Sequence, residues 1–453
     1  MKRRHHGLAA LAALSVLAVA ACGSSGSSSS SSNSSAPAAN SSGSTSSAST
    51  QGGGTAAGDF GTLGQVCGPG NATGATATGV TNSSVEVSVI ADINVPGAPG
   101  LLQPMWDSAT AFTDWCNAAG GIDGRKIILD KRDSQETDYL PQVETSCTAD
   151  FAMVGTMGVL DNTGVSAWEK CGIPNFTAST VSEQAANAQL MYPTNPLPAD
   201  QENIGGFPVI FQQYPGVQDH IGTLYSEGAS GAREQHTYNE AIAADGGKVV
   251  YTAEYNATGQ VNWAPYVEAM KNAGVQMLFL NDTIATSVGL DQAMATAGWY
   301  PTVQISPPQD YDTSFLSTGA TVAKNYYVYM PSEPLEAANA VPAVASYESI
   351  VQKYVPSAHL GFFGIMAFSS WLLFAEAAKD CGSTLTRTCL EQQVAKQTDW
   401  TGGGLQGSIN PASNKASQCF IVMKIEGDKF VQAIPSKLGQ FYCNPANVPI
   451  VKP

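Results

Sequence analysis

The chain has 453 residues, of which 43% are hydrophobic, and a formal net charge of −16. This length and composition can bury a large core, and the length is typical of about two or three domains. An acidic chain without a Lys/Arg-rich run is a poor nucleic-acid binder, so we expect no nucleic-acid partner. Solubility outside a cell is explanation enough for the acidity.

The N-terminus has the pattern of a secretory signal over residues 1–21. Basic residues 2–4 are followed by an apolar run over 8–20, which is short for a membrane-spanning helix. Residues 19–22, Val-Ala-Ala-Cys, resemble the lipobox of bacterial lipoproteins, in which Cys22 becomes the lipidated N-terminus after cleavage. We therefore expect a lipid anchor at Cys22. The alternative is an ordinary signal peptide with an incidental cysteine.

The segment after the signal is predicted to be unfolded. Residues 22–58 are almost entirely Ser, Gly, Ala, Thr and Asn, which cannot bury enough apolar surface to fold. A flexible chain of this kind reaches roughly 30–36 Å, so it would act as a tether. Residues 59–80 form a turn-rich extension that leads into the folded part.

The folded part opens with a βαβ unit. Residues 85–93 alternate between apolar and polar, broken only by Ile90, and predict a strand. Pro and Gly mark 94–100 as a loop, the 4-3-4 apolar spacing predicts a helix over 101–119, and the glycines that follow end it. A second strand follows at 125–130. Such units build parallel sheets.

The same alternation continues along the chain. Strands that alternate with helices indicate doubly wound α/β lobes. The predicted helices cover 139–149, 163–170, 232–244, 263–273, 288–297, 341–354 and 361–379. The predicted strands cover 151–155, 173–176, 219–225, 248–252, 277–280 and 302–306, with a hairpin at 419–425 and 429–434. The apolar helix 361–379 contains charged residues, so we interpret it as a buried helix and not as a membrane span.

Eight cysteines follow Cys22, which indicates an oxidising compartment. Eight cysteines allow many pairings. Chain context favours four disulfides: Cys67–Cys116, Cys147–Cys171, Cys381–Cys389 and Cys419–Cys443. A zinc site is disfavoured because no C-x2-C pair and no H-x3-5-H pair follows the signal.

The opening unit also resembles a known family. Strand 85–92 and residues 117–127, Asn-Ala-Ala-Gly-Gly-Ile-Asp-Gly-Arg-Lys-Ile, look like the start of type I periplasmic binding proteins. The nearest branch is the leucine/isoleucine/valine-binding receptors of ABC importers. The resemblance covers roughly residues 65–445, and the Cys-Gly-Pro-Gly piece at 67–70 resembles actinobacterial members.

The resemblance implies an α/β fold of two doubly wound, Rossmann-like lobes joined by hinge crossovers. The first lobe would comprise residues 81–207 plus 332–400. The second would comprise 208–331 plus 401–453. The ligand would lie between the lobes.

Two stretches resemble motifs of enzymes or cofactor sites in their residue letters but lack the context or the full pattern that these motifs need. The glycine pattern at 402–407 neither follows a predicted strand nor opens a helix, so no NAD or FAD is expected. Ser166 lacks the second glycine of a nucleophile elbow, because Trp168 stands there. No histidine after the signal has a recognisable acid partner; these are His220, His236 and His359. We therefore expect neither an enzyme nor a cofactor.

The candidate site consists of loops at the carboxyl ends of predicted strands, where α/β sheets bind ligands. These loops are 94–96, 155–162 and 177–180 in the first lobe, and 227–230, 281–283 and 308–311 in the second. For any single residue, ordinary turn or cap chemistry is the alternative. The candidate ligand-binding residues are Asn94, Pro96, Met157, Gly158, Val159, Leu160, Asp161, Thr177, Ala178, Ser179, Ser230, Asn281, Asp282 and Gln309.

The resemblance also bears on the ligand. Relatives that bind amino acids hold the carboxylate with hydroxyl residues of the loop that matches 157–161, but Gly-Val-Leu stands at 158–160 here. The loop at 177–179 does fit the family. A ligand larger or less charged than leucine is therefore at least as well supported. Asp161 could meet a cation or a hydroxyl, and Asp282 or Asp310 could meet an ammonium group.

Together these features indicate a solute-binding lipoprotein on the outer face of a bacterial membrane. It would act as a monomer, capture a small organic, amino-acid-like or related ligand, and deliver it to an ABC transporter permease. One alternative is a sensor module of the same fold with a signalling partner. A secreted α/β hydrolase is a weaker alternative.

Overall fold

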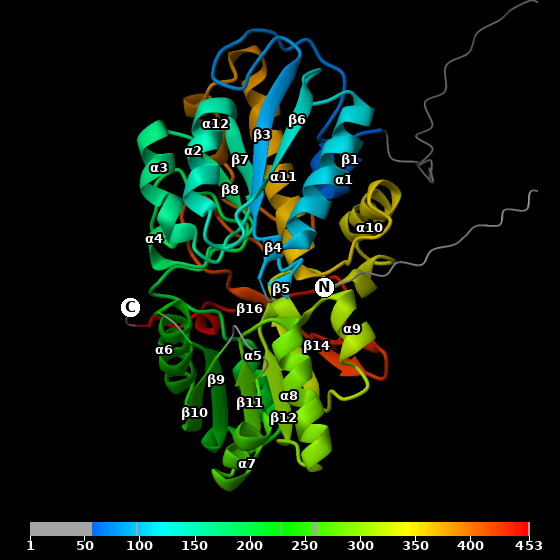
Figure 1. Cartoon of the computed structure of the whole chain (residues 1–453). Helices are drawn as coiled ribbons and strands as arrows, with labels where there is room; N and C mark the ends of the chain where they lie inside the picture. Colours follow the sequence, from blue (N-terminus) through cyan, green and yellow to red (C-terminus); the bar gives the residue numbers. More distant parts are fainter. Residues whose placement is uncertain (1–56, 97, 228, 257–260, 452–453) are drawn as a thin grey trace, which may run out of the picture. The chain divides into compact units, whose positions relative to one another are not determined.

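The computed structural model describes residues 57–96, 98–227, 229–256 and 261–451 (Figure 1). The predicted signal sequence, Cys22 and nearly all of the predicted tether lie outside the described residues. The described part carries two main β-sheets, each with helices on both faces.

The first sheet has the strand order β6-β3-β7-β8, and all of its pairings are parallel. Its strands are β3 (Ser84–Ala91), β6 (Lys126–Asp133), β7 (Ala152–Thr156) and β8 (Asn175–Thr177). The helices around it are α1 (Gln103–Ala119), α2 (Tyr139–Ala149), α3 (Val165–Cys171), α10 (Pro342–Tyr354), α11 (Phe362–Cys381) and α12 (Arg387–Val394).

Burial of both faces explains why Ile90 breaks the alternation of β3. Val87 and Val89 belong to the core that contains α1 and α11. Ile90 packs on the opposite face, with Tyr139 of α2 and Trp168 of α3. A parallel strand covered on both faces carries apolar residues on both.

The second sheet has the order β10-β9-β11-β12-β13-β14-β15, and β16 also pairs with β14. The pairings from β10 to β13 are parallel and those of β14 are antiparallel. Its strands are β9 (Ile221–Ser226), β10 (Val249–Tyr255), β11 (Met277–Leu280), β12 (Val303–Ser306), β13 (Tyr326–Met330), β14 (Cys419–Glu426), β15 (Lys429–Ile434) and β16 (Tyr442–Cys443).

Helices cover both faces of this sheet as well. Side chains of α5 and α6 pack on one face, with Phe279 of β11. Side chains of α7 and α8 pack on the other, with Leu278 of the same strand. These helices and the short α9 are α5 (Gly206–Gln213), α6 (Ala229–Ala244), α7 (Ala264–Asn272), α8 (Ile284–Ala297) and α9 (Thr313–Thr318).

The α/β fold class with two Rossmann-like lobes is confirmed. One central strand was not predicted: β13, which lies between β12 and β14. All five of its residues, Tyr-Tyr-Val-Tyr-Met, are buried. Such a run has no period-2 signal, because both of its faces are covered. The short helices α5, α9 and α12 were also not predicted.

Helix α4 (Glu183–Ala186) still packs with the first lobe. Three chain segments then link the two lobes, at 187–205, 331–341 and 395–418. They are hydrogen-bonded to one another: the Gln406 side-chain amide donates to the Thr194 carbonyl at 2.8 Å, and the Glu333 amide donates to the Leu405 carbonyl at 2.8 Å. The Ser369 hydroxyl of α11 in turn donates to the Gln406 side-chain oxygen at 2.6 Å. The crossings are therefore tied to the first lobe by polar contacts.

The structure contains the four disulfides that chain context favoured. Cys67–Cys116 ties the N-terminal extension to α1, and Cys147–Cys171 joins α2 to α3. Cys381–Cys389 joins α11 to α12, and Cys419–Cys443 joins β14 to β16.

Helix α11 is long and apolar enough to cross a membrane by length and composition alone, and 83% of its apolar window is buried in the protein. It packs within the first-lobe core against α1 and β7. The interpretation as a buried core helix is confirmed.

Candidate ligand-binding cleft

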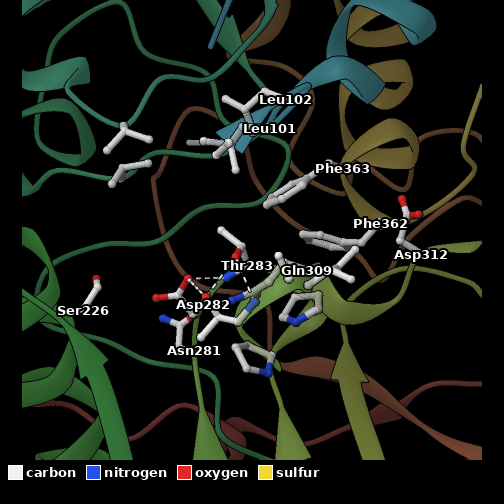
Figure 2. Close-up of a pocket in the computed structure, with 18 of the residues that line it drawn as sticks. Leu101, Leu102, Ser226, Asn281, Asp282, Thr283, Gln309, Asp312, Phe362 and Phe363 are labelled. Carbon is white, nitrogen blue, oxygen red and sulfur yellow. Dashed lines mark hydrogen bonds between the residues drawn. The ribbon is translucent and has the colours of Figure 1, made fainter. Parts of the chain in front are cut away.

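A cleft of about 1690 Å³ is lined by residues of both lobes (Figure 2). The first lobe contributes the segment that leads into α1, the loops after β7 and β8, and the start of α11. The second contributes the loops after β11 and β12, with parts of α6 and α8. The crossing segment 195–203 also lines it.

The wall from the first lobe is apolar around the starts of α1 and α11. Leu101 and Leu102 precede α1, and Phe362 and Phe363 open α11 (Figure 2). Residues 94–99, predicted as a loop, form a small antiparallel hairpin of β4 (Asn94–Val95) and β5 (Ala98–Pro99), which positions the segment before α1.

The wall from the second lobe is polar. Asn281 follows β11, and Gln309 follows β12. The Gln309 amide donates to the Asn281 side-chain oxygen, and the Asn281 amide donates to Glu234 Oε2 at 3.1 Å. A chain of donors thus ends on the carboxylate of Glu234 in α6.

Asp282 also lines this wall, and its carboxylate is occupied. It accepts hydrogen bonds from the Thr283 amide, the Thr286 hydroxyl and the Tyr255 hydroxyl. Burial raises the pKa of Asp282, and these hydrogen bonds oppose the rise. Thr283 is the N-cap of α8 and accepts the Thr286 amide, and the Asp282 carboxylate lies beside this helix end.

Five carboxylate residues of the cleft lining were not among the predicted residues: Asp107, Glu136, Glu202, Glu234 and Asp312. Glu202 lies on the crossing segment and Glu234 on α6, and both are half-buried. Burial and repulsion from Glu234 raise the pKa of Glu202 to about 8. Burial and repulsion from Asp282 raise the pKa of Glu234 to about 7, against the opposing effect of Arg233. No sequence signal pointed to either residue, because a glutamate in a polar loop or a helix is usually solvated.

Arg233 spans the cleft. It belongs to α6 of the second lobe, yet its guanidinium donates to the Val181 carbonyl of the first lobe at 3.3 Å. Its Nε also lies 4.0 Å from a carboxylate oxygen of Glu183. Arg233 therefore already holds contacts on both sides.

Half of the candidate residues line the cleft. These are Pro96, Met157, Val159, Ser179, Asn281, Asp282 and Gln309. Six lie away from its wall: Asn94, Gly158, Leu160, Asp161, Thr177 and Ala178. The side chain of Ser230, in the first turn of α6, lies outside the described part of the chain.

The structure gives several of these six another role. The Asn94 amide donates to Asp133 at 2.6 Å, and the Thr177 hydroxyl bonds to the carbonyl groups of Thr156 and Ser179. A Cβ on Gly158 would meet the Tyr139 ring at 2.4 Å, so a side chain does not fit there. These residues shape the loops behind the cleft wall.

Asp161 and Asp310, both candidates for a ligand cation, are buried structural carboxylates. Asp161 accepts the backbone amides of Val181 and Ser182 at 2.8 and 3.0 Å, and burial raises its pKa to about 6. Asp310 accepts the hydroxyls of Ser287 and Tyr326 at 2.9 and 2.6 Å, and burial also raises its pKa to about 6.

The loop after β8 contains one buried hydroxyl without a partner. Thr180 lines the cleft and is 3% exposed. Its hydroxyl oxygen is buried and has no hydrogen-bond partner among the described residues. A buried polar group without a partner is costly.

Within the described residues, no group of three or more His, Cys, Asp or Glu side chains could hold a metal ion. Two α/β lobes with a cleft at the carboxyl ends of their strands define a protein that binds a small molecule between lobes.

Comparison with known proteins gives the family. The model of the periplasmic binding protein family matches residues 84–429, and the chain belongs to this family, with the type I fold. No curated protein sequence matches the chain.

Solved structures share the fold at low sequence identity. The fatty acid ABC transporter substrate-binding protein of Thermomonospora curvata has a TM-score of 0.70 and 15% identity, and the match covers 84% of this chain and 97% of that one. The branched-chain amino acid transporter substrate binding protein of Streptococcus pneumoniae, in complex with isoleucine, has a TM-score of 0.61 and 16% identity, covering 78% and 100%. A solute binding protein of Rhodopseudomonas palustris, in complex with 3,4-dihydroxy benzoic acid, has a TM-score of 0.63 and 15% identity, covering 77% and 96%.

Proposed function

We propose that this protein is an extracytoplasmic solute-binding lipoprotein that captures a small organic ligand between its lobes and delivers it to the permease of an ABC importer. The observation that carries the proposal is the cleft, which both lobes line at the carboxyl ends of their strands. A ligand that contacts both walls favours the closed arrangement, because it gains contacts there that the open arrangement lacks.

The cleft supports a ligand larger than a single aliphatic amino acid. Its volume of about 1690 Å³ exceeds the roughly 300–1,000 Å³ of common small-molecule sites. The loop after β7 brings Met157 and Val159 to the wall instead of hydroxyl groups. Similar structures hold isoleucine or an aromatic acid, so an amino-acid-like or related organic solute is the proposed class.

The proposal includes a membrane anchor at Cys22. The small residues before Cys22 and the Ser/Gly-rich segment after it support a lipidated, tethered receptor. Expression in a bacterial host with a radiolabelled fatty acid tests the anchor. The wild type should be labelled and membrane-bound, and Cys22→Ser should lose the label. A Cys22→Ser protein that keeps both the label and the membrane location would contradict the anchor.

A thermal-shift screen tests solute binding. The panel should contain amino acids, short peptides, amides, amines, sugars, and aromatic and fatty acids. A ligand at about a thousandfold excess over its Kd stabilises the folded protein by about 4 kcal/mol, so one class should raise the Tm clearly without being turned over. Failure of every class to raise the Tm would count against a solute receptor.

Substitutions in the polar wall of the second lobe test whether the ligand binds in the cleft. Asn281→Ala removes the residue that links Gln309 to Glu234, and it should weaken binding of the best ligand about tenfold. Asn272→Ala is the matched control, because Asn272 is an exposed asparagine at the end of α7 in the same lobe. It should leave binding unchanged.

A further inference from the structure

The charged residues that line the cleft are mostly acidic. Six described lining residues are acidic, and Arg233 is the one Lys or Arg among them. The six are Asp107, Glu136, Glu202, Glu234, Asp282 and Asp312.

Three of the six carboxylates are occupied by local donors. Asp107 accepts the Gln103 amide at 2.8 Å, and Asp312 accepts the Ser314 amide of α9 at 2.7 Å. Asp282 accepts the Thr283 amide and the Thr286 hydroxyl beside the N-terminus of α8, where Thr283 is the N-cap. A carboxylate at this helix end makes it less favourable for a ligand anion.

The other three are Glu136, which follows β6 in the first lobe, and Glu202 and Glu234, which line the cleft from the crossing segment and from α6. Glu202 and Glu234 are both half-buried, and repulsion from Glu234 contributes to the raised pKa of Glu202. Glu234 accepts one neutral donor, the Asn281 amide, which leaves its charge uncompensated.

Arg233 is the basic neighbour of these two glutamates, but it is engaged with Val181 and Glu183 of the first lobe. Carboxylates that line one cleft in partly apolar surroundings are stabilised by an added cation.

The opposite wall matches an apolar ligand body. Leu101, Leu102 and Phe363 lie across the cleft from Asn281 and Gln309 in Figure 2.

We propose that the ligand is an organic cation, an amine with an apolar body, whose ammonium group lies between Glu202 and Glu234 and whose body packs on the first-lobe wall. This inference rests on the proposed function and names its ligand class. A carboxylate on the ligand is not required, because Arg233 is the one Lys or Arg among the described lining residues and is already engaged with the first lobe, and His359 is the one histidine among them.

Binding of such a cation should depend on pH. Both glutamates hold protons near neutral pH because burial and repulsion raise the pKa of each. The groups that face them are Arg233 and Tyr238 of α6, Asp282 after β11, Tyr329 of β13 and Asp161 of the first lobe. A cation binds the deprotonated pair, so it releases protons and its affinity rises with pH.

Titration calorimetry with matched probes tests the inference. The probes are octylamine and 4-phenylbutylamine, with octanoate and 4-phenylbutyrate as carboxylates of the same bodies. The amines should bind and the carboxylates should not. The Kd of the amines should fall at least about tenfold between about pH 6 and about pH 8, because the paired glutamates lose their protons in this range.

Two conservative variants sharpen the test. Glu234→Gln keeps the size of the side chain, and it should weaken amine binding about tenfold and flatten the pH dependence. Glu240→Gln is the matched control, because Glu240 is an exposed glutamate on the same helix. Unliganded melting curves of both variants check that each one folds.

Several outcomes would overturn the inference. One is binding of the carboxylate probes without binding of the amines. Another is amine binding whose Kd changes neither with pH nor in the Glu234→Gln variant. A third is the absence of any amine binding. A carboxylate or neutral ligand would leave the proposed receptor function standing. If no ligand of the thermal-shift panel raised the Tm, both the receptor function and the amine ligand class would be contradicted.

Discussion

Arg125 shows how a single residue of the opening motif organises the fold. Its side chain is 2% exposed, and its guanidinium donates to the carbonyl groups of Thr81, Gly382 and Thr73 at 3.0, 2.7 and 2.7 Å. One side chain thus joins the N-terminal extension, the start of the first sheet and the end of α11. A planar guanidinium with several fixed donors suits this role.

Replacing Arg125 should be severe. Arg125→Met removes these hydrogen bonds and leaves three carbonyl groups without their donor, so it should lower the free energy of unfolding by about 3–5 kcal/mol. Chemical denaturation measures the change. Lys126→Met is the control, because Lys126 is exposed, and it should cost less than about 1 kcal/mol. Similar costs for both variants would contradict this role.

Some residues of the cleft could be predicted from the sequence near them, and others could not. Asn281 and Gln309 could be predicted, because both follow strands and the carboxyl ends of parallel strands meet at one edge. Glu202 and Glu234 could not, since their burial depends on how a crossing segment packs against α6. Asp161 follows the same strand-end rule, but it turns inward to bind two backbone amides, and no sequence pattern distinguishes these orientations.

At the scale of elements, sequence patterns predicted most of the strands and the longer helices but not β13. Strand β11 and helix α2 begin and end where the sequence placed them. Strand β13 is buried on both faces and gave no alternation to detect. The crossings were expected only from the family resemblance, because their hydrogen bonds join residues far apart in the chain.

The disulfides should differ in their contribution to stability. Closing a longer loop restricts the unfolded chain more. Cys67–Cys116 spans 49 residues and Cys381–Cys389 spans 8. Replacing both cysteines by alanine should cost about 4 kcal/mol for the first pair and about 2.5 kcal/mol for the second. Equal losses in denaturation experiments would contradict the loop-length argument.

At the scale of the whole molecule, buried carboxylates should make the protein more stable in mild acid. Burial raises the pKa of Asp161 and Asp310 to about 6, of Glu234 and Glu333 to about 7, and of Glu202 and Asp291 to about 8. Unfolded carboxylates titrate near pH 4. Between about pH 4 and about pH 8 the folded state therefore binds more protons, and stability falls as pH rises.

Melting curves test this dependence. The Tm should be about 2–5 °C lower at about pH 8.5 than at about pH 5. Asp291→Asn removes one of the buried charges and keeps the oxygen that accepts the Gln304 amide, so it should flatten the dependence. A Tm that rises steadily over this range would contradict the sign.

The central claim is that one solute is held between two lobes. Small-angle X-ray scattering of the protein, with and without the best ligand of the thermal-shift panel, tests it most directly. A ligand that contacts both walls should reduce the radius of gyration at saturation, because it draws the lobes together. Saturating binding that leaves the scattering curve unchanged would contradict capture between the lobes.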